Sequence, residues 1–277
     1  YEAGGRMIDT AEAYSSWVPG NIGGESERII GEWQESRDVR SDLLIGTKTG
    51  MGGPPGASKP EAVHKALEGS LERLRTDYVD IYYSHHDDLV TPLDEVVSGY
   101  DAIYRGGKAR ELGASNYTAE RLSHITAEAE LLGMQPFTVL QPEYNVVIRN
   151  AYQGALQDVC LARGMAVLPF YGLASGFLSG KYRSAREWEG SPRARALNAA
   201  AHAGGFHILE VMDGIAKDTG KTHAQIALAW LNVQPGVAAP LASATNLIQL
   251  KELCDAASIL LSNDQIAQLD GALPPAT

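Results

Sequence analysis

The feature that most constrains the fold is a regular alternation of two kinds of segment along the chain. Short apolar runs rich in Val, Ile and Leu alternate with longer segments in which apolar residues recur at helical spacing. Continuous apolar runs indicate strands buried on both faces, and their alternation with helices indicates parallel strands joined by helical crossovers. The runs that predict strands are residues 6–10, 43–49, 79–84, 110–115, 137–141, 166–171 and 237–242.

The segments between these runs predict helices. They cover residues 26–35, 60–75, 93–105, 118–132, 151–163, 206–219, 222–232, 246–257 and 263–271. Residues 181–205 have no clean period, so we expect a long loop there. An open doubly wound sheet and a closed barrel both fit this alternation.

Polar residues at the strand ends favour the barrel. They follow successive apolar runs, as expected where the carboxyl ends of barrel strands form one face. These residues are Asp9, Lys48, His85, Ser115, Asn116 and Gln141. Because a barrel has eight strands and seven are identifiable, we read YEAGG at the start as a helix end and expect a first strand upstream of Tyr1. The prediction is one α/β domain over residues 1–277, a (β/α)8 TIM barrel.

Composition narrows the classes of function. The chain has 277 residues, which one α/β barrel can occupy, and a formal net charge of −11 without a basic block, which disfavours nucleic acid as a partner. No apolar run approaches the length of a membrane span, and no signal peptide is visible. Cys160 and Cys254 have no paired spacing, as in a reducing compartment. We therefore expect a cytoplasmic enzyme.

Four residues near the strand ends could together act as a general acid. A phenol such as Tyr14 is a weak acid at neutral pH unless a cation stabilises its phenolate, and Lys48 could supply that cation. Asp9 could hold the lysine charged, and His85 could hydrogen-bond a substrate oxygen. Taken alone, Asp9 could be a strand-end cap and Tyr14 a packing aromatic. A lysine after the apolar run LLIGT needs a buried partner, which makes Lys48 the most telling of the four.

Six motifs stand in a fixed order along nearly the whole chain: DTAEAY, GTKTG, SLERLRTDYVDIYYSH, GASNY, LQPEYN and GFLSGKY. In this order and at this spacing they closely resemble the aldo-keto reductases, bacterial members included. The resemblance implies a (β/α)8 barrel that binds a nicotinamide cofactor in extended form, without a Rossmann domain. It implies hydride transfer to an aldehyde or ketone, and a first βα unit that is missing before Tyr1.

The resemblance assigns catalytic roles residue by residue. Tyr14 would be the proton donor, with its phenolate stabilised by Lys48. Asp9 would pair with that lysine, and His85 would orient the carbonyl group. The strand that ends at Asp9 would place this carboxylate under the lysine, and the following loop would bring Tyr14 back over the barrel mouth.

The resemblance also assigns cofactor contacts. Ser115, Asn116 and Gln141 would hold the carboxamide, and Phe170 would stack on the nicotinamide ring. The segment GLASG, residues 172–176, would wrap the pyrophosphate. In full, the implied cofactor-binding residues are Ser115, Asn116, Gln141, Phe170, Gly172, Leu173, Ser175, Gly176, Ser243, Thr245 and Gln249.

The sequence departs from the family at the end of the cofactor site. Thr245 stands where many members have an arginine that meets the 2′-phosphate of NADP, and Leu253 stands where an asparagine that contacts adenine is common. Ser243, Thr245, Asn246 and Lys251 could still contact a phosphate. The expected cofactor is NADPH, with NADH left open.

Several other sequence patterns can be interpreted either as structural features or as functional sites. The HHDD run at 85–88 suggests a metal, but adjacent strand residues point to opposite faces, so we expect no metal site. The GMGGPP run at 50–55 lacks a phosphate-loop pattern and predicts a loop. Trp17 and Met51 are candidates for the wall of the substrate pocket or for surface packing. The arginines of the predicted long loop, Arg183, Arg186, Arg193 and Arg195, could cover cofactor phosphates or lie in solvent.

The predicted function is NAD(P)H-dependent reduction of an aldehyde or ketone to an alcohol, with a tyrosine as the proton donor. Two alternatives stay open: an NAD-linked dehydrogenase of a sugar or alcohol, and a cofactor-binding regulatory subunit with weak catalysis. The expected partner is a small carbonyl substrate. Neither its identity nor the oligomeric state can be read from the sequence, because selectivity lies in variable loops.

Overall fold

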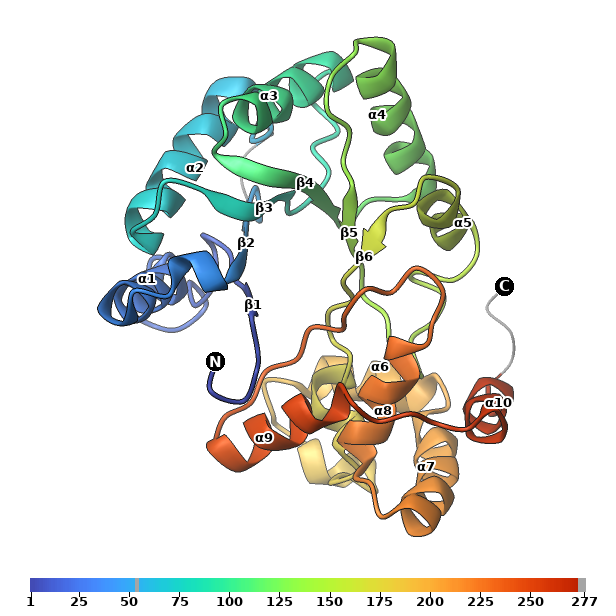
Figure 1. The fold of residues 1–277 in the computed structure, drawn as a ribbon. Helices are drawn as coiled ribbons and strands as arrows, with labels where there is room; N and C mark the ends of the chain where they lie inside the picture. Colours follow the sequence, from blue (N-terminus) through green and yellow to red (C-terminus); the bar gives the residue numbers. More distant parts are fainter. Residues whose placement is uncertain (53–54, 274–277) are drawn as a thin grey trace. The chain divides into compact units, whose positions relative to one another are not determined.

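The structure, a computed structural model, describes residues 1–52 and 55–273. These residues divide into two compact units. The first unit consists of Tyr1 and Gly5–Gln141 and carries a parallel sheet, and the second consists of Glu2–Gly4 and Pro142–Thr277 and is mainly helical (Figure 1). The middle of the GMGGPP run, residues 53–54, lies outside the described residues.

The sheet of the first unit has its strands in sequence order, and all neighbouring strands are parallel. Its strands are β1 (Met7–Asp9), β2 (Leu44–Thr49), β3 (Val79–Ser84), β4 (Ala109–Ser115) and β5 (Val139–Gln141). The connecting helices are α1 (Glu25–Arg37), α2 (Pro60–Leu74), α3 (Leu93–Arg105) and α4 (Ala119–Leu131). Helices α2, α3 and α4 lie side by side on one face of the sheet (Figure 1). The first five predicted strands and the first four predicted helices are therefore confirmed.

Helix α2 shows why these segments form and pack as they do. Pro60 begins the helix, where its missing N–H is not needed, and Val63, Leu67 and Leu74 are buried at helical spacing. Tyr82 on β3 points to this helix and donates its hydroxyl proton to the carbonyl of Val63, at 3.1 Å. One face of the sheet is thereby covered, which leaves the other face for polar chemistry.

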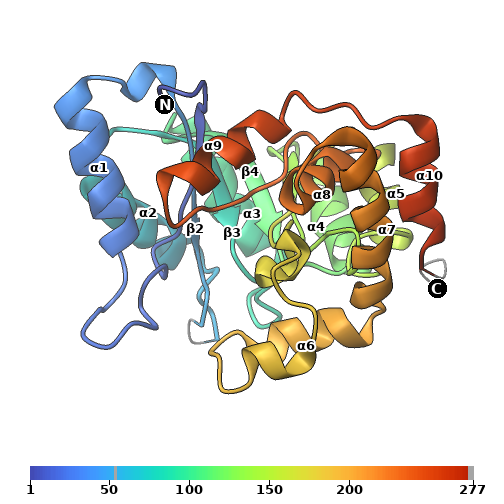
Figure 2. The ribbon, with the colours of Figure 1, turned by 90° about the horizontal axis from the view of Figure 1, so that it is seen from below.

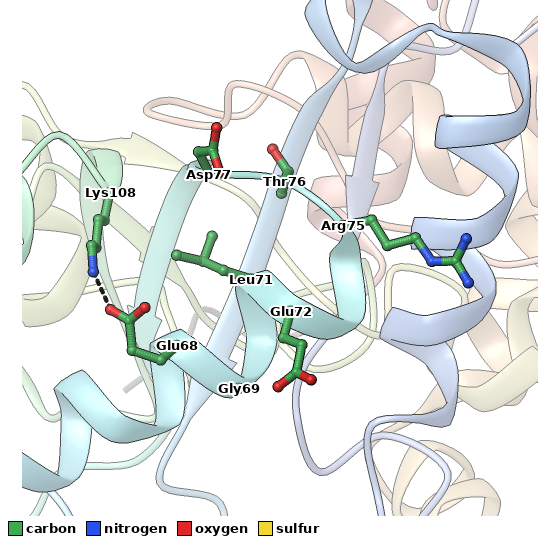
Figure 3. A pocket seen from close by; sticks show the side chains of 8 residues that line it. All are labelled: Glu68, Gly69, Leu71, Glu72, Arg75, Thr76, Asp77 and Lys108. Carbon is green, nitrogen blue, oxygen red and sulfur yellow. Dashed lines mark hydrogen bonds and ion pairs between the residues drawn. The ribbon is translucent and has the colours of Figure 1, made fainter.

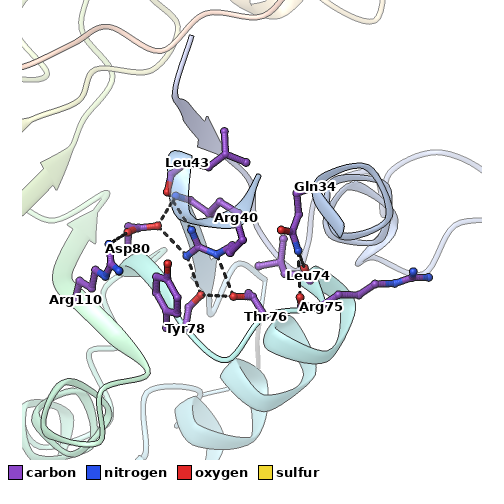
Figure 4. A network of polar contacts seen from close by, with 10 residues as sticks. Gln34, Arg40, Leu43, Leu74, Arg75, Thr76, Tyr78, Asp80 and Arg110 are labelled. Atoms are coloured by element: carbon purple, nitrogen blue, oxygen red, sulfur yellow. Dashed lines mark hydrogen bonds and ion pairs between the residues drawn. The ribbon is translucent and has the colours of Figure 1, made fainter. Parts of the chain in front are cut away.

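A polar network closes the amino ends of the strands in the first unit (Figure 4). Buried Asp80 on β3 accepts hydrogen bonds from Arg40 at 2.8 Å and from Arg110 at 2.9 Å. The two guanidinium groups also lie over the ring of Tyr78, at 3.9 and 4.3 Å from its centre. Because Arg40 lies in the short 3₁₀ helix η1 (Arg40–Asp42) and Arg110 lies on β4, the network ties three segments together.

The second unit is built mainly of helices around Trp230, which is fully buried on α8. Helix α7 packs against α8 and α10 (Figure 2). The elements of this unit are α5 (Ala155–Ala162), β6 (Ala166–Val167), η2 (Ala174–Ser179), η3 (Ala185–Trp188), α6 (Ala194–His202), α7 (Gly205–Thr219), α8 (His223–Asn232), α9 (Leu247–Ala256) and α10 (Asn263–Gly271).

Two predicted strands of this unit are shorter than expected. The strand predicted at 166–171 stops at Val167, and the one predicted at 237–242 is reduced to a single bridge between Val237 and Val167. Pro169 and Pro240 explain the difference, because proline has no N–H to donate to a ladder. The described residues therefore contain six strands. The α/β class with parallel strands is confirmed, and the closed eight-stranded barrel stays a prediction.

Three other predictions were wrong in detail. Residues 181–205 are not one long loop, because they include η3 and α6, whose Leu197 and Ala200 are buried. The predicted helix at 151–163 begins only at Ala155, since Gly154 has a positive φ of 92°. The YEAGG segment forms a turn and not the end of a helix.

Candidate active site

A lysine ammonium group with three partners lies at the centre of the candidate site. Lys48, which is 0% exposed, donates to the carboxylate of Asp9 at 2.6 Å, to the carbonyl of Thr10 at 2.8 Å and to the hydroxyl of Tyr14 at 3.0 Å. These three bonds use all the donors of an ammonium group. The other oxygen of Asp9 accepts from the side-chain amide of Gln141 at 2.8 Å. The structure therefore brings Asp9, Tyr14 and Lys48 together, as predicted.

The backbone explains how Tyr14 reaches the lysine. Asp9 lies opposite Gly46 in the β1–β2 ladder, two residues before Lys48. The chain follows β2 a little further, because the N–H of Glu12 donates to the carbonyl of Lys48 at 3.2 Å. A turn then closes with a bond from the N–H of Tyr14 to Ala11. This turn carries Tyr14 back over the lysine.

The burial of Lys48 changes its acid–base properties. Burial lowers the pKa of its ammonium group, while the negative charge of Asp9 and their hydrogen bond oppose this shift. The ammonium nitrogen is 4.6 Å from the ring centre of Tyr14 and 5.7 Å from that of Tyr83. The ring of Tyr83 fits because β4 carries Gly113 beside it, where any Cβ would overlap the ring. The lysine is thus enclosed by a carboxylate and two aromatic rings.

His85 lies beside this group, just after the end of β3. Its backbone N–H donates to Thr49 at 2.8 Å, and its carbonyl accepts from the side chain of Asn116 at 2.9 Å. Its ring meets the ring of Tyr14 edge-on, with the centres 6.0 Å apart. Burial, the charge of Lys48 and the neighbouring His86 lower the pKa of His85 to about 3. The ring is therefore neutral near pH 7 and can donate one hydrogen bond.

The lowered pKa of His85 predicts that the protein loses stability at acidic pH. An unfolded histidine titrates near 6.5, whereas folded His85 titrates at about 3. Between these values the unfolded chain takes up a proton that the folded chain does not, so stability is lost as the pH falls from about 6.5 towards 3. We expect the Tm of His85→Gln to fall less than that of the wild type between about pH 8 and pH 4. Equal losses in both proteins would contradict the prediction.

The residues predicted to hold the carboxamide lie at the ends of β4 and β5. The hydroxyl of Ser115 donates to the carbonyl of Gln141 at 2.8 Å, and the amide of Asn116 donates to that hydroxyl at 3.1 Å. Asn116 has a positive φ of 58°, which an asparagine tolerates better than most residues do. The structure therefore gathers hydroxyl and amide groups at this strand end.

The segment 172–176 of the second unit has an unusual backbone. Ala174, Ser175 and Gly176 have positive φ angles of 46°, 58° and 95°. Arg193 donates to the carbonyl of Ser175 at 3.4 Å, and a Cβ built on Gly176 would lie 3.7 Å from cationic nitrogens of both Arg193 and Lys181. Lys181 was missed as a site residue, although it belongs to the GFLSGKY motif. Two cations therefore flank the segment predicted to wrap the pyrophosphate.

The remaining predicted cofactor residues in this unit differ in their surroundings. Phe170 is half-buried, and its ring meets that of the exposed Tyr171 edge-on. Ser243 is exposed. Thr245 donates through its hydroxyl to the side chain of Gln249 at 2.9 Å, just before α9. Gly172 is packed against Leu228 and Leu231, and the carbonyl of Leu173 accepts from the N–H groups of Gly176 and Leu178.

Two other cations that could have met a phosphate have acidic partners. Lys251 pairs with Asp255 at 2.7 Å, and Arg183 pairs with Asp213 at 2.9 Å. Arg193 and Lys181, in contrast, are basic side chains placed at the Ser175–Gly176 turn.

The two predicted pocket-wall residues are exposed. Trp17 is 66% exposed, and its ring meets that of Tyr14 edge-on at 6.0 Å. Met51 is 43% exposed in the loop after β2. The contact with Tyr14 connects Trp17 directly to the candidate site.

The expectation that His85 and His86 point to opposite faces is wrong. Strand β3 ends at Ser84, and the rings of His85 and His86 stack on each other instead of pointing to opposite faces. A search of residues 1–52 and 55–273 finds no group of three or more His, Cys, Asp or Glu side chains that could hold a metal ion. In the same residues, no helix is long and apolar enough to cross a membrane.

A hollow lies at the opposite end of the strands of the first unit from Lys48 (Figure 3). Its walls come from the end of α2 and the residues that precede β3 and β4, such as Asp77 and Lys108. Lys108 is paired with Glu68, and Arg75 with Glu35. Because this hollow lies at the opposite end of the strands from Lys48, it does not contribute to the candidate site.

Comparisons with known proteins agree with the motifs. The model of the aldo/keto reductase family matches residues 1–274. An aryl-alcohol dehydrogenase [NADP(+)] of Phanerodontia chrysosporium is 27% identical over 99% of the chain and 74% of its own length. A probable voltage-gated potassium channel subunit beta of Arabidopsis thaliana is 31% identical over 93% of the chain and 79% of its own length.

A solved structure is similar over nearly the whole chain. The crystal structure of a thermostable aldo-keto reductase in complex with the inhibitor epalrestat is 28% identical and has a TM-score of 0.76. The match covers 98% of this chain and 83% of that one. The sequence resemblance and the likeness of the fold therefore lead to the same group of proteins.

Proposed function

Because the chain belongs to the aldo/keto reductase family, we propose that its oxidoreductase activity uses Tyr14 as the proton donor to a carbonyl oxygen. The observation that carries this proposal is the position of Lys48, within hydrogen-bonding distance of both the Tyr14 hydroxyl and the Asp9 carboxylate. A cation there stabilises the phenolate that remains when Tyr14 gives up its proton. Asp9 keeps the cation in place and balances its charge.

In the proposed reaction an aldehyde or ketone becomes an alcohol. A nicotinamide cofactor, held by the residues named below, would supply the hydride for the carbonyl carbon. Tyr14 delivers the proton to the carbonyl oxygen, so that the C=O bond becomes a CH–OH group, and the phenolate is later reprotonated from water. Neutral His85 donates a hydrogen bond to the same oxygen and thereby fixes the carbonyl next to the tyrosine.

The residues present fit a nicotinamide cofactor. Hydroxyl and amide groups of Ser115, Asn116 and Gln141 suit a carboxamide, which has both a donor and an acceptor. Lys181 and Arg193 at the Ser175–Gly176 turn suit the phosphates. We propose that these residues, the stacking ring of Phe170 and the segment 172–176 hold the cofactor, with Ser243, Thr245 and Gln249 at its adenosine end.

Absorbance measurements test the activity directly. Full-length protein mixed with NADPH and an aromatic aldehyde such as 4-nitrobenzaldehyde should consume NADPH and form one alcohol per NADPH consumed. A protein that binds NADPH without consuming it, with any carbonyl offered, would instead support a regulatory subunit. The similarity to a relative named as a probable potassium channel subunit is a reason to distinguish this second function from catalysis.

The cofactor preference is a separate prediction. We expect NADPH to bind about tenfold more tightly than NADH, a difference of about 1.4 kcal/mol, in a fluorescence titration. The name of the fungal relative, which includes NADP(+), supports this expectation, while Thr245 at the arginine position opposes it. Equal or reversed affinity would favour an NAD-linked alcohol dehydrogenase.

We also propose that the enzyme is a single closed (β/α)8 barrel domain and that it lies in the cytoplasm. Its substrate would be a small carbonyl compound, with Trp17 and Met51 at the wall of the substrate pocket. The free thiols of Cys160 and Cys254 support that location.

A further inference from the structure

The rings of two consecutive histidines stack at the end of β3. Their centres are 5.4 Å apart, and their planes differ by 29°. His85 is buried and His86 is exposed. Consecutive side chains in a strand point to opposite faces, so this stack requires the strand to end before His85.

Ser84 stabilises the change of direction. Its buried hydroxyl donates to the backbone carbonyl of His86 at 3.1 Å and also hydrogen-bonds the hydroxyl of Tyr117, at 2.9 Å. The backbone of His85 is fixed on both sides by Thr49 and Asn116. Three hydrogen bonds therefore hold the backbone that carries both rings, and a fourth holds the Ser84 hydroxyl in place.

The ring of His85 is held less firmly than its backbone. Its Nδ1 atom is buried and, among the described residues, has no hydrogen-bond partner. No hydrogen bond at this atom therefore selects a tautomer or prevents the ring from flipping, which would exchange its two nitrogens. The contacts that limit the ring are packing contacts, made edge-on by Tyr14 and face-on by His86.

We propose that His86 is a positioning residue whose stacked ring keeps the His85 imidazole in the orientation that donates to the carbonyl oxygen. The inference rests on the proposed function, in which His85 orients the substrate. The stack holds the plane of the His85 ring, and a flip that exchanges its two nitrogens would have to break the contact with His86.

The neighbouring charges do not supply another role for His86. Asp87 pairs with Arg121 at 2.9 Å, and Asp88 accepts from the hydroxyl of Thr91 at 2.7 Å and from the N–H of Ser58 at 3.0 Å. The two carboxylates that follow His86 are thus directed to other partners. The contact that His86 itself makes with His85 is through the face of its ring.

Two substitutions separate the ring surface from its nitrogens. His86→Ala removes the stack, and we expect kcat for an aromatic aldehyde to fall about tenfold, while the Kd for NADPH changes less than twofold. His86→Phe keeps a flat ring, and we expect its kcat to stay within about twofold of the wild type. His124→Ala, an exposed histidine on α4, is the matched control and should leave kcat unchanged.

The orientation can also be measured without turnover. Imidazole ¹⁵N shifts of the protein, with His85 identified by loss of its signals in His85→Gln, should show one tautomer in the wild type and in His86→Phe. They should show a mixture in His86→Ala. Unchanged shifts and kcat in His86→Ala would overturn the proposal, as would a His86→Phe variant as impaired as His86→Ala. Because the shifts do not require a reaction, they distinguish a failure of this proposal from a failure of the proposed function.

Discussion

Replacement of Tyr14 by Phe should lower kcat for aldehyde reduction by about 10²–10⁴-fold, the usual contribution of a positioned general acid. The substitution removes the hydroxyl that lies 3.0 Å from the Lys48 nitrogen and keeps the aromatic ring. The hydroxyl is part-buried beside the site, so the fold and the binding of NADPH should be retained. Steady-state kinetics with 4-nitrobenzaldehyde and a fluorescence titration with NADPH measure the two effects.

A surface tyrosine provides the control for this substitution. Tyr104 is 37% exposed on α3, and Tyr104→Phe should leave kcat within about twofold of the wild type. If Tyr14→Phe retained most of its turnover, the proton would have to come from another group, and the assignment of Tyr14 would be wrong.

Replacement of Lys48 by Met should damage both activity and stability. Without the cation, the phenolate of Tyr14 loses its stabilisation, and we expect a loss of kcat at least as large as that of Tyr14→Phe. The carboxylate of Asp9 also loses its partner at 2.6 Å, and breaking one side of a buried pair costs about 3–5 kcal/mol. Urea unfolding measures this second effect.

The double variant separates the two causes. Asp9→Asn combined with Lys48→Met removes the unpaired charge, so stability should recover in part while activity does not. Lys65→Met, at an exposed position of α2, is the control for the loss of one positive charge. If Lys48→Met unfolded at the same urea concentration as Lys65→Met, the lysine would not be the structural centre of the site.

The strands and helices of the first unit could be predicted well from the sequence, because the patterns that indicate them involve residues close together in the chain. The apolar run of β2 and the helical spacing of Val63, Leu67 and Leu74 in α2 each follow from neighbouring residues. The strand ends then placed Asp9 and Lys48 at one edge of the sheet. The position of Tyr14 could be expected only through the resemblance, since a turn at Ala11 determines it.

The parts that were missed depend on distant contacts or on backbone detail. The indole of buried Trp188 donates to Asn198 on α6 at 2.8 Å, and the spacing of apolar residues in the sequence does not predict such a contact. Lys181 lies near Gly176 only because that turn has positive φ angles. The end of β3 at residue 84 was predicted correctly, but the stack of His85 and His86 depends on how the next two side chains turn, which sequence patterns do not define.

The three hydrogen bonds of Lys48 have a consequence for an enzyme that handles aldehydes. A neutral lysine amine condenses readily with an aldehyde to form an imine, and burial favours the neutral form here. The nitrogen, however, is directed to Asp9, Thr10 and Tyr14 and is 0% exposed, so no lone pair faces the substrate. The same bonds that make Tyr14 an acid therefore protect the lysine from covalent capture by the compounds it helps to reduce.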